Sequence, residues 1–127
     1  MKFNNLADMI ARINVAKRRR LWHVNVRYTE ECAKIATKLL LDGYLRNFEI
    51  LDNKTMRIHF YYHYNTNGLR ELRLISSPGF KRYLKIRDLK SKYFTFANVY
   101  LWTNAGLLDL KEAIAKNQGG YAILSVN

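Results

Sequence analysis

Two clusters of basic residues are the part of this 127-residue chain best suited to bind a ligand. A lysine or arginine that neutralises a phosphate releases condensed counterions, so a basic surface binds nucleic acid in a salt-dependent way. A solvated face that only aids solubility would explain one cluster, but two clusters in a chain of net charge +12 favour a polyanionic partner. The first cluster is Lys17, Arg18, Arg19 and Arg20, and the second is Lys81, Arg82, Lys85, Arg87, Lys90 and Lys92, with aromatic residues such as Tyr83 between them.

A small polar segment, Trp102-Thr103-Asn104-Ala105-Gly106, follows a strand-like run of residues. It offers a hydroxyl group, a side-chain amide and backbone N–H groups at the end of a strand, and its glycine lets the backbone approach a partner closely. Such groups suit folded RNA, where shape and the 2′-hydroxyl are recognised. An ordinary tight turn would explain the same residues, so the segment alone leaves both interpretations open.

No residue pattern in the chain is typical of a catalytic centre or a metal site. It lacks a glycine-rich phosphate motif, a Gly-x-Ser-x-Gly elbow and a Cys/His nucleophile pair. The single cysteine, Cys32, rules out a disulfide within the chain and is expected to be a small buried residue. His59 and His63 would share a strand face, but Arg57 lies on that face and no third ligand is evident, so solvated or phosphate-facing histidines are expected. We therefore expect no enzyme, cofactor or small-molecule substrate.

The first half of the chain predicts two helices and four strands. Helical spacing of Leu6, Met9, Ile10 and Ile13 predicts an N-terminal helix. Strict alternation in the run from Leu21 to Tyr28 predicts a half-buried strand, with Trp22, Val24, Val26 and Tyr28 on the inner face. A helix capped by Thr29 and ended by Gly43 follows. The next strands, joined as two hairpins, are predicted at Tyr44–Leu51, Met56–Tyr64 and Leu69–Ser76.

The second half predicts mostly strands after a break at Ser77-Pro78-Gly79. A strand at Phe96–Trp102 and a short one at Leu107–Leu108 precede a helix. Asp109 caps this helix, and Glu112 three residues later completes a capping-box pattern. Gly119-Gly120 is expected to end the helix, and a last strand closes the chain.

These elements predict an α+β fold of two small subdomains. Residues 1–76 would form an N-terminal α-β-α-β-β-β subdomain, and residues 77–127 a β-rich, RNA-binding one with a short helix. No apolar run approaches the roughly 20 residues that a membrane-spanning helix needs. An organelle presequence or an anionic-membrane binder would also begin with an amphipathic basic helix, but Asp8 and the missing linker argue against the presequence. The membrane binder would need exposed bulky apolar residues.

Several motifs resemble the eighth family of small-subunit ribosomal proteins, essentially from end to end. The opening Leu6-Ala7-Asp8-Met9-Ile10 is similar to the start of that family, and Gly43-Tyr44 resembles its Gly-Phe. Ser77-Pro78-Gly79, followed by Lys81, Arg82 and Tyr83, resembles its Pro-Gly-x-Arg-x-Tyr motif, and residues 102–106 occupy its Ser-Thr-Ser-x-Gly loop. The resemblance implies direct binding of the central domain of small-subunit ribosomal RNA beside neighbouring ribosomal proteins, with Thr103, Asn104 and Gly106 in the contacting loop.

The chain also departs from the family pattern. Trp102 and Asn104 replace the two loop serines, so hydroxyl contacts are lost and an indole ring is gained that could stack on a base. These departures, and a composition rich in residues with AT-rich codons, favour a mitochondrial member over a plastid or bacterial one. A non-ribosomal RNA-binding regulator is the alternative function.

Overall fold

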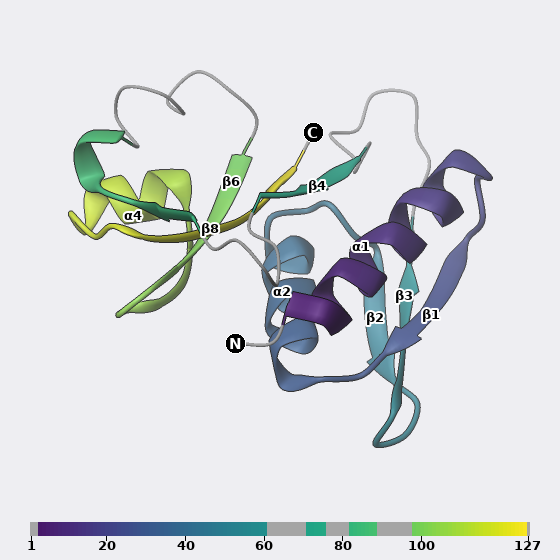
Figure 1. Cartoon of the computed structure of the whole chain (residues 1–127). Helices are drawn as coiled ribbons and strands as arrows, with labels where there is room; N and C mark the ends of the chain where they lie inside the picture. Colours follow the sequence, from purple (N-terminus) through teal and green to yellow (C-terminus); the bar gives the residue numbers. More distant parts are fainter. Residues whose placement is uncertain (1–2, 61–70, 76–81, 89–97, 127) are drawn as a thin grey trace. The chain divides into compact units, whose positions relative to one another are not determined.

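The computed structural model describes residues 3–60, 71–75, 82–88 and 98–126, which form two compact units (Figure 1). Unit 1 spans Met1–Glu71 and unit 2 spans Leu72–Asn127. The expected division between residues 76 and 77 falls on residues outside the described ranges. Both units mix helices with antiparallel strands, so the predicted α+β class is confirmed.

Unit 1 consists of two helices packed on a three-stranded antiparallel sheet of order β1-β3-β2. Helix α1 contacts β1 and α2, and α2 also contacts β2 (Figure 1). The elements are α1 (Phe3–Arg18), β1 (His23–Arg27), α2 (Glu30–Leu41), β2 (Asn47–Ile50) and β3 (Thr55–His59).

The core of unit 1 follows the apolar periodicity of the sequence. The predicted α1 stripe is buried, and so is the inner face of the strand that continues to Phe60. The prediction for the inner face of β1 is only partly correct, because Val26 is buried whereas Trp22 is 61% exposed. Strand β1 begins only at His23, so Trp22 lies in the turn after α1, where strand alternation does not set its direction.

The start of α2 confirms the predicted cap and the buried cysteine. The Thr29 hydroxyl accepts a hydrogen bond from the Cys32 backbone N–H at 3.2 Å, which satisfies one orphan donor of the first turn. Cys32 is fully buried. Burial raises the pKa of the Cys32 thiol and the Thr29 hydrogen bond partly offsets this, so the thiol stays protonated and unreactive at neutral pH.

Helices α1, α2 and α4 (Leu110–Ala115) all end in the same turn, the Schellman motif. In this motif the second residue after the last helical residue adopts a left-handed backbone, which L side chains rarely do. Gly43 takes this position after α2, with φ 84°, and Asn117 takes it after α4, with φ 56°. The corresponding residue after α1 is Arg20, with φ 55°. Glycine and asparagine are the usual residues here, and arginine is not.

Unit 2 is built on a five-stranded sheet with β8 at its centre. Strand β8 pairs with β4, β5 and β6, and β6 pairs with β7, all antiparallel. Helix α4 contacts β6 and β7 and closes one face over a core that includes Leu101, Leu108 and Ala113. The strands are β4 (Leu72–Leu74), β5 (Arg82–Leu84), β6 (Asn98–Thr103), β7 (Gly106–Asp109) and β8 (Gly120–Val126).

The described parts of the two strands in the predicted second hairpin do not pair with each other, and its central residues 61–70 lie outside the described ranges. Its first strand, β3, pairs with β1 and β2, whereas β4, expected to pair with it, pairs with β8 across the register Leu72↔Val126. The first hairpin, β2–β3, is confirmed, and the Asp52 carboxylate accepts the backbone N–H groups of Lys54 and Thr55 in its turn at 2.7 and 2.8 Å. Over the described ranges, no helix is long and apolar enough to cross a membrane.

The ends of α4 confirm one prediction and correct another. Asp109 and Glu112 form the predicted capping box, in which the Asp109 carboxylate accepts the Glu112 backbone N–H at 2.7 Å. The helix ends at Ala115, before the Gly119-Gly120 pair, and Asn117 takes the left-handed position. The two glycines serve another purpose, a close approach of strands described below.

The capping box gives the first prediction. Asp109→Ala should lower the free energy of unfolding by about 1 kcal/mol, because it removes the acceptor for an orphan N–H of α4. The matched control is Lys111→Ala on the exposed side of the same helix, which should change stability by less than about 0.5 kcal/mol. Urea denaturation measures both, and equal losses would contradict the capping role.

Candidate nucleic-acid interface

The segment expected to contact RNA is the tip of the β6–β7 hairpin. Thr103 pairs with Gly106 at the end of the ladder, so Asn104 and Ala105 form a two-residue turn. Both turn residues are exposed. Gly106 has φ 103°, and this left-handed conformation lets the chain reverse without steric strain. The tip is therefore narrow, and its backbone can approach a partner closely.

The Thr103 side chain, expected to contact RNA, makes hydrogen bonds within the hairpin turn. It is only 7% exposed, and its hydroxyl donates to the Gly106 carbonyl at 2.9 Å and accepts from the Ala105 N–H at 3.1 Å. Because successive strand residues point to opposite faces, Thr103 turns towards the core while Trp102 turns away from it. The hydroxyl thus holds the hairpin turn together, and contact of Thr103 with RNA stays a prediction.

An aromatic row crosses the outer face of the unit 2 sheet next to this tip. Tyr83 on β5 lies opposite Tyr121 on β8, which lies opposite Trp102 on β6. Directly opposed residues of antiparallel strands share a face. The two tyrosine rings are 56% and 42% exposed and meet edge to face, with centroids 5.2 Å apart. Tyr121 was not predicted from the sequence, because only the register of β8 brings it between the other two.

Two glycines make this arrangement possible. A Cβ atom on Gly120 would lie 2.5 Å from the Trp102 carbonyl oxygen, and one on Gly119 would lie 2.6 Å from the Leu84 carbonyl oxygen. Both obstacles are backbone atoms, which cannot rotate away. The Gly119-Gly120 pair therefore lets β8 enter between β5 and β6 and sets the spacing of the aromatic row.

Basic side chains flank the row on β5 and just after it. Arg82, Lys85 and Arg87 are exposed. Arg82 pairs with Ala122 of β8, which is buried, and is itself exposed because β5 lies at the edge of the described sheet. The Lys85 backbone N–H donates to the Asp88 carboxylate at 3.2 Å, which fixes the chain beyond β5. The other predicted members of this cluster, Lys81, Lys90 and Lys92, lie outside the described residues, as does Pro78-Gly79.

The second basic surface lies at the carboxyl end of α1 in unit 1. Arg18, Arg19 and Arg20 are exposed there, where the negative end of the helix dipole favours cations. Lys17 is half-buried, and its Nζ atom lies 5.4 Å from the centre of the Phe60 ring. Burial, and secondly the positive charge of Arg20, lower the pKa of Lys17. The cluster is thus crowded enough for its charges to repel one another.

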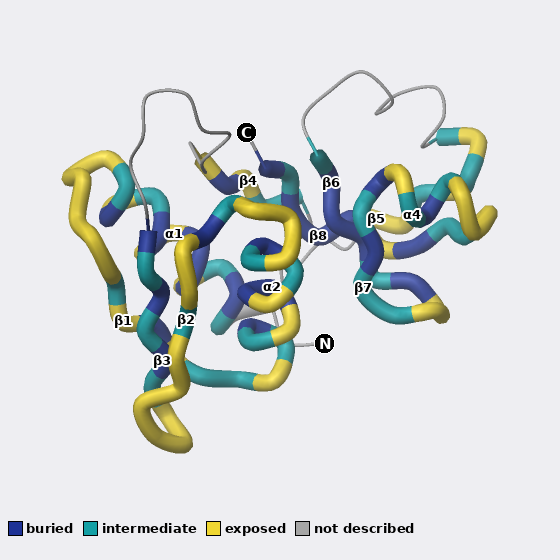
Figure 2. The backbone as a smooth tube through the Cα atoms, turned by 180° about the vertical axis from the view of Figure 1, so that it is seen from behind, coloured by how far each residue is buried: buried dark blue, intermediate teal, exposed yellow. Residues whose placement is uncertain are grey.

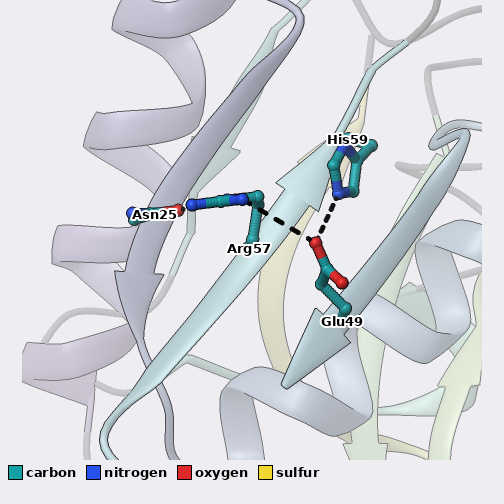
Figure 3. Close-up of polar contacts among 4 residues, drawn as sticks. All are labelled: Asn25, Glu49, Arg57 and His59. Atoms are coloured by element: carbon teal, nitrogen blue, oxygen red, sulfur yellow. Dashed lines mark hydrogen bonds and ion pairs between the residues drawn. The ribbon is translucent and has the colours of Figure 1, made fainter. Parts of the chain in front are cut away.

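On the outer face of unit 1, His59 and Arg57 are engaged with other polar side chains (Figure 3). His59 Nε2 lies 3.0 Å from Glu49 Oε1, and the Arg57 Nε donates to the Asn25 side-chain oxygen at 2.9 Å. The His23 and His59 rings meet edge to face. In the described part of the chain, no group of three or more potential ligands could hold a metal ion, and His63 lies outside it.

Comparison of the sequence with known proteins finds one matching family and several similar proteins. Residues 4–127 match the family described as Ribosomal protein S8. The small ribosomal subunit protein uS8 of Mycoplasmopsis pulmonis is 31% identical, over 93% of this chain and 92% of that protein. The mitochondrial protein uS8m of Acanthamoeba castellanii is 32% identical, over 96% and 98%. The uS8 protein of Rickettsia typhi is also 32% identical, over 97% and 96%.

The geometry of the hairpin tip predicts separate roles for its two polar residues. Thr103→Val should lower the free energy of unfolding by about 1–2 kcal/mol, because the Ala105 N–H and the Gly106 carbonyl lose a partner. Thr103→Ser keeps the hydroxyl and should cost about 0.8 kcal/mol or less. The exposed control, Asn104→Ala, should stay within about 0.5 kcal/mol of the unaltered protein. Thermal denaturation of the three variants checks this; a Val variant as stable as the Ser variant would contradict it.

Proposed function

Because the chain belongs to the ribosomal protein S8 family, we propose that it is a structural, RNA-binding component of a small ribosomal subunit and not an enzyme. Its RNA partner is the central domain of the small-subunit ribosomal RNA, and its other partners are neighbouring proteins of the subunit. A free-standing RNA-binding regulator is not favoured, since the similar proteins compared above carry ribosomal names and match almost the whole chain.

The observation that carries the RNA-binding proposal is the aromatic row beside an exposed hairpin tip. Aromatic rings offer stacking surfaces for unpaired bases and riboses, and each stacked base contributes about 1–3 kcal/mol. Arg82 and Lys85, on and next to the strand that carries Tyr83, supply charges for the adjoining phosphates. The exposed amide of Asn104 and the narrow turn provide hydrogen-bonding groups that distinguish one folded RNA from another.

We further propose that the subunit belongs to a mitochondrial ribosome. The similarity to the mitochondrial protein of Acanthamoeba castellanii and the AT-rich codon bias of the composition support this location. The bacterial relatives are equally similar, so the location needs its own test. Mass spectrometry of purified mitochondrial small subunits should detect this chain, and its exclusive recovery with another ribosome would contradict a mitochondrial location.

The aromatic row gives a direct test of the proposed function. Trp102→Ala should weaken binding to a transcript of the ribosomal RNA central domain by about 5- to 100-fold, since one base no longer has a stacking surface. Asn104→Ala should weaken it less, and both losses should be smaller on a random duplex of equal length. Ile50→Ala removes an exposed apolar side chain from unit 1 and should leave affinity unchanged. Equal losses on the two RNAs would argue against specific recognition by the tip.

The basic residues give a second test. The double variant Arg82→Gln, Lys85→Gln should reduce the slope of log affinity against log salt concentration by about 0.7–0.9 for each phosphate that the protein no longer neutralises. The control is the double variant Lys34→Gln, Arg46→Gln, which has the same net charge but changes exposed residues of unit 1. Filter binding between about 50 and 200 mM salt measures both slopes. Identical slopes for the two variants would remove Arg82 and Lys85 from the interface.

A further inference from the structure

The turn after α1 combines an unfavourable backbone with an unusual side chain. The Arg20 N–H donates to the Lys17 carbonyl at 3.1 Å, and the Leu21 N–H donates to the Ala16 carbonyl at 2.9 Å, which completes the Schellman motif. These bonds hold Arg20 in the left-handed region. The other two helices place Gly43 and Asn117 at this position, so the same turn forms without an arginine.

An arginine at such a position suggests a role outside the fold. An unfavourable backbone conformation at an exposed residue does not help the protein to fold. Residues held in such conformations cluster at functional sites. The Arg20 side chain is exposed and does not fill the core. Burial lowers the pKa of Lys17 and the positive charge of Arg20 lowers it further, so Arg20 adds repulsion to an already crowded cluster. The strained backbone and the charge repulsion both lower the stability of the isolated protein, and an anionic partner would offset the repulsion.

The same turn exposes the largest apolar side chain of unit 1. Trp22 is 61% exposed and Leu21 is 46% exposed, although a Schellman motif often packs the residue at the Leu21 position against its helix. The Trp22 carbonyl accepts the Phe60 N–H at 2.8 Å, which anchors its backbone to the end of β3. The indole ring is thus held at the surface beside three exposed arginines by a fixed backbone.

We propose that the turn Arg18–Trp22 is a second RNA-binding site, separate from the hairpin tip. Trp22 stacks on an unpaired base or a ribose, and Arg20 with its two neighbouring arginines binds the adjacent phosphates. The inference rests on the proposed RNA-binding function and adds a site in unit 1. The central side chain of this site is Trp22, which strand alternation alone would place in the core.

Charge favours RNA over a protein as the occupant. Arg12 pairs with Asp8 at 3.0 Å, but between Arg12 and Glu30 the chain has no carboxylate side chain and carries five basic residues: Lys17, Arg18, Arg19, Arg20 and Arg27. A cluster of one sign suits a continuous polyanion. A planar ring beside guanidinium groups is also the combination that binds an unpaired nucleotide, with stacking on the base and hydrogen bonds to its phosphates.

The test compares variants at Arg20 and Trp22 with control variants elsewhere in unit 1, all in the full chain and with the same central-domain transcript. Arg20→Gly should raise the melting temperature by about 3 °C, because glycine adopts the left-handed backbone freely. It should also weaken RNA binding more than Arg46→Gln, which removes one exposed charge elsewhere in unit 1. Trp22→Ala should weaken binding by about 5-fold or more, and Trp22→Phe by less. Leu41→Ala, at the most exposed large apolar side chain among the described residues, should have no effect.

The outcomes separate this inference from the proposed function. If the unaltered chain does not bind the transcript, both fail. If it binds and the Trp22→Ala and Arg20→Gly variants bind as tightly as their controls, only the second site is overturned. A lower melting temperature for Arg20→Gly would overturn the strain argument on which the site rests. Variants that bind RNA normally but are lost from purified subunits would assign the turn to a protein contact instead, and would also overturn the inference.

Discussion

The pairing of β8 with three other strands is the interaction on which the candidate interface in unit 2 depends. Strand β5 has only three residues, and its pairing with β8 fixes its register relative to β6, which pairs with the other edge of β8. Most of β8 is buried (Figure 2), so the aromatic row rests on the best-packed part of the sheet. The backbone of Gly120 lies against Trp102, and any side chain there would force the two strands apart. A rigid platform of this kind loses little conformational entropy when it binds a ligand.

Surplus positive charge links the stability of the chain to its partner. A net charge of +12 repels itself in the isolated protein, and the lowered pKa of Lys17 reports part of that repulsion at the end of α1. A polyanion that binds only the folded chain stabilises it in proportion to the logarithm of its concentration over its dissociation constant. The fold can therefore tolerate the left-handed Arg20 and the crowded cations, provided that it functions within a ribonucleoprotein.

Local signals made the helices and the caps at their N-terminal ends predictable from the sequence, whereas the partners of distant strands and the end of α4 were not. The α1 stripe and the caps at Thr29 and Asp109 are encoded within one or two turns of helix, and the structure confirms them. The partner of β4 is β8, more than forty residues away, and no local pattern specifies it. Strand alternation also places Trp102 and Thr103 on opposite faces of β6. The segment expected to contact RNA therefore combines an outward indole ring with an inward hydroxyl that closes the turn.

The most direct test of the account is a structure of the native small ribosomal subunit that contains this chain. The account predicts that Asn104 and Ala105 at the hairpin tip, together with the Trp102 ring, lie in contact with the nucleotides of the ribosomal RNA central domain. A tip that faces solvent, or that is covered only by another protein, would contradict it.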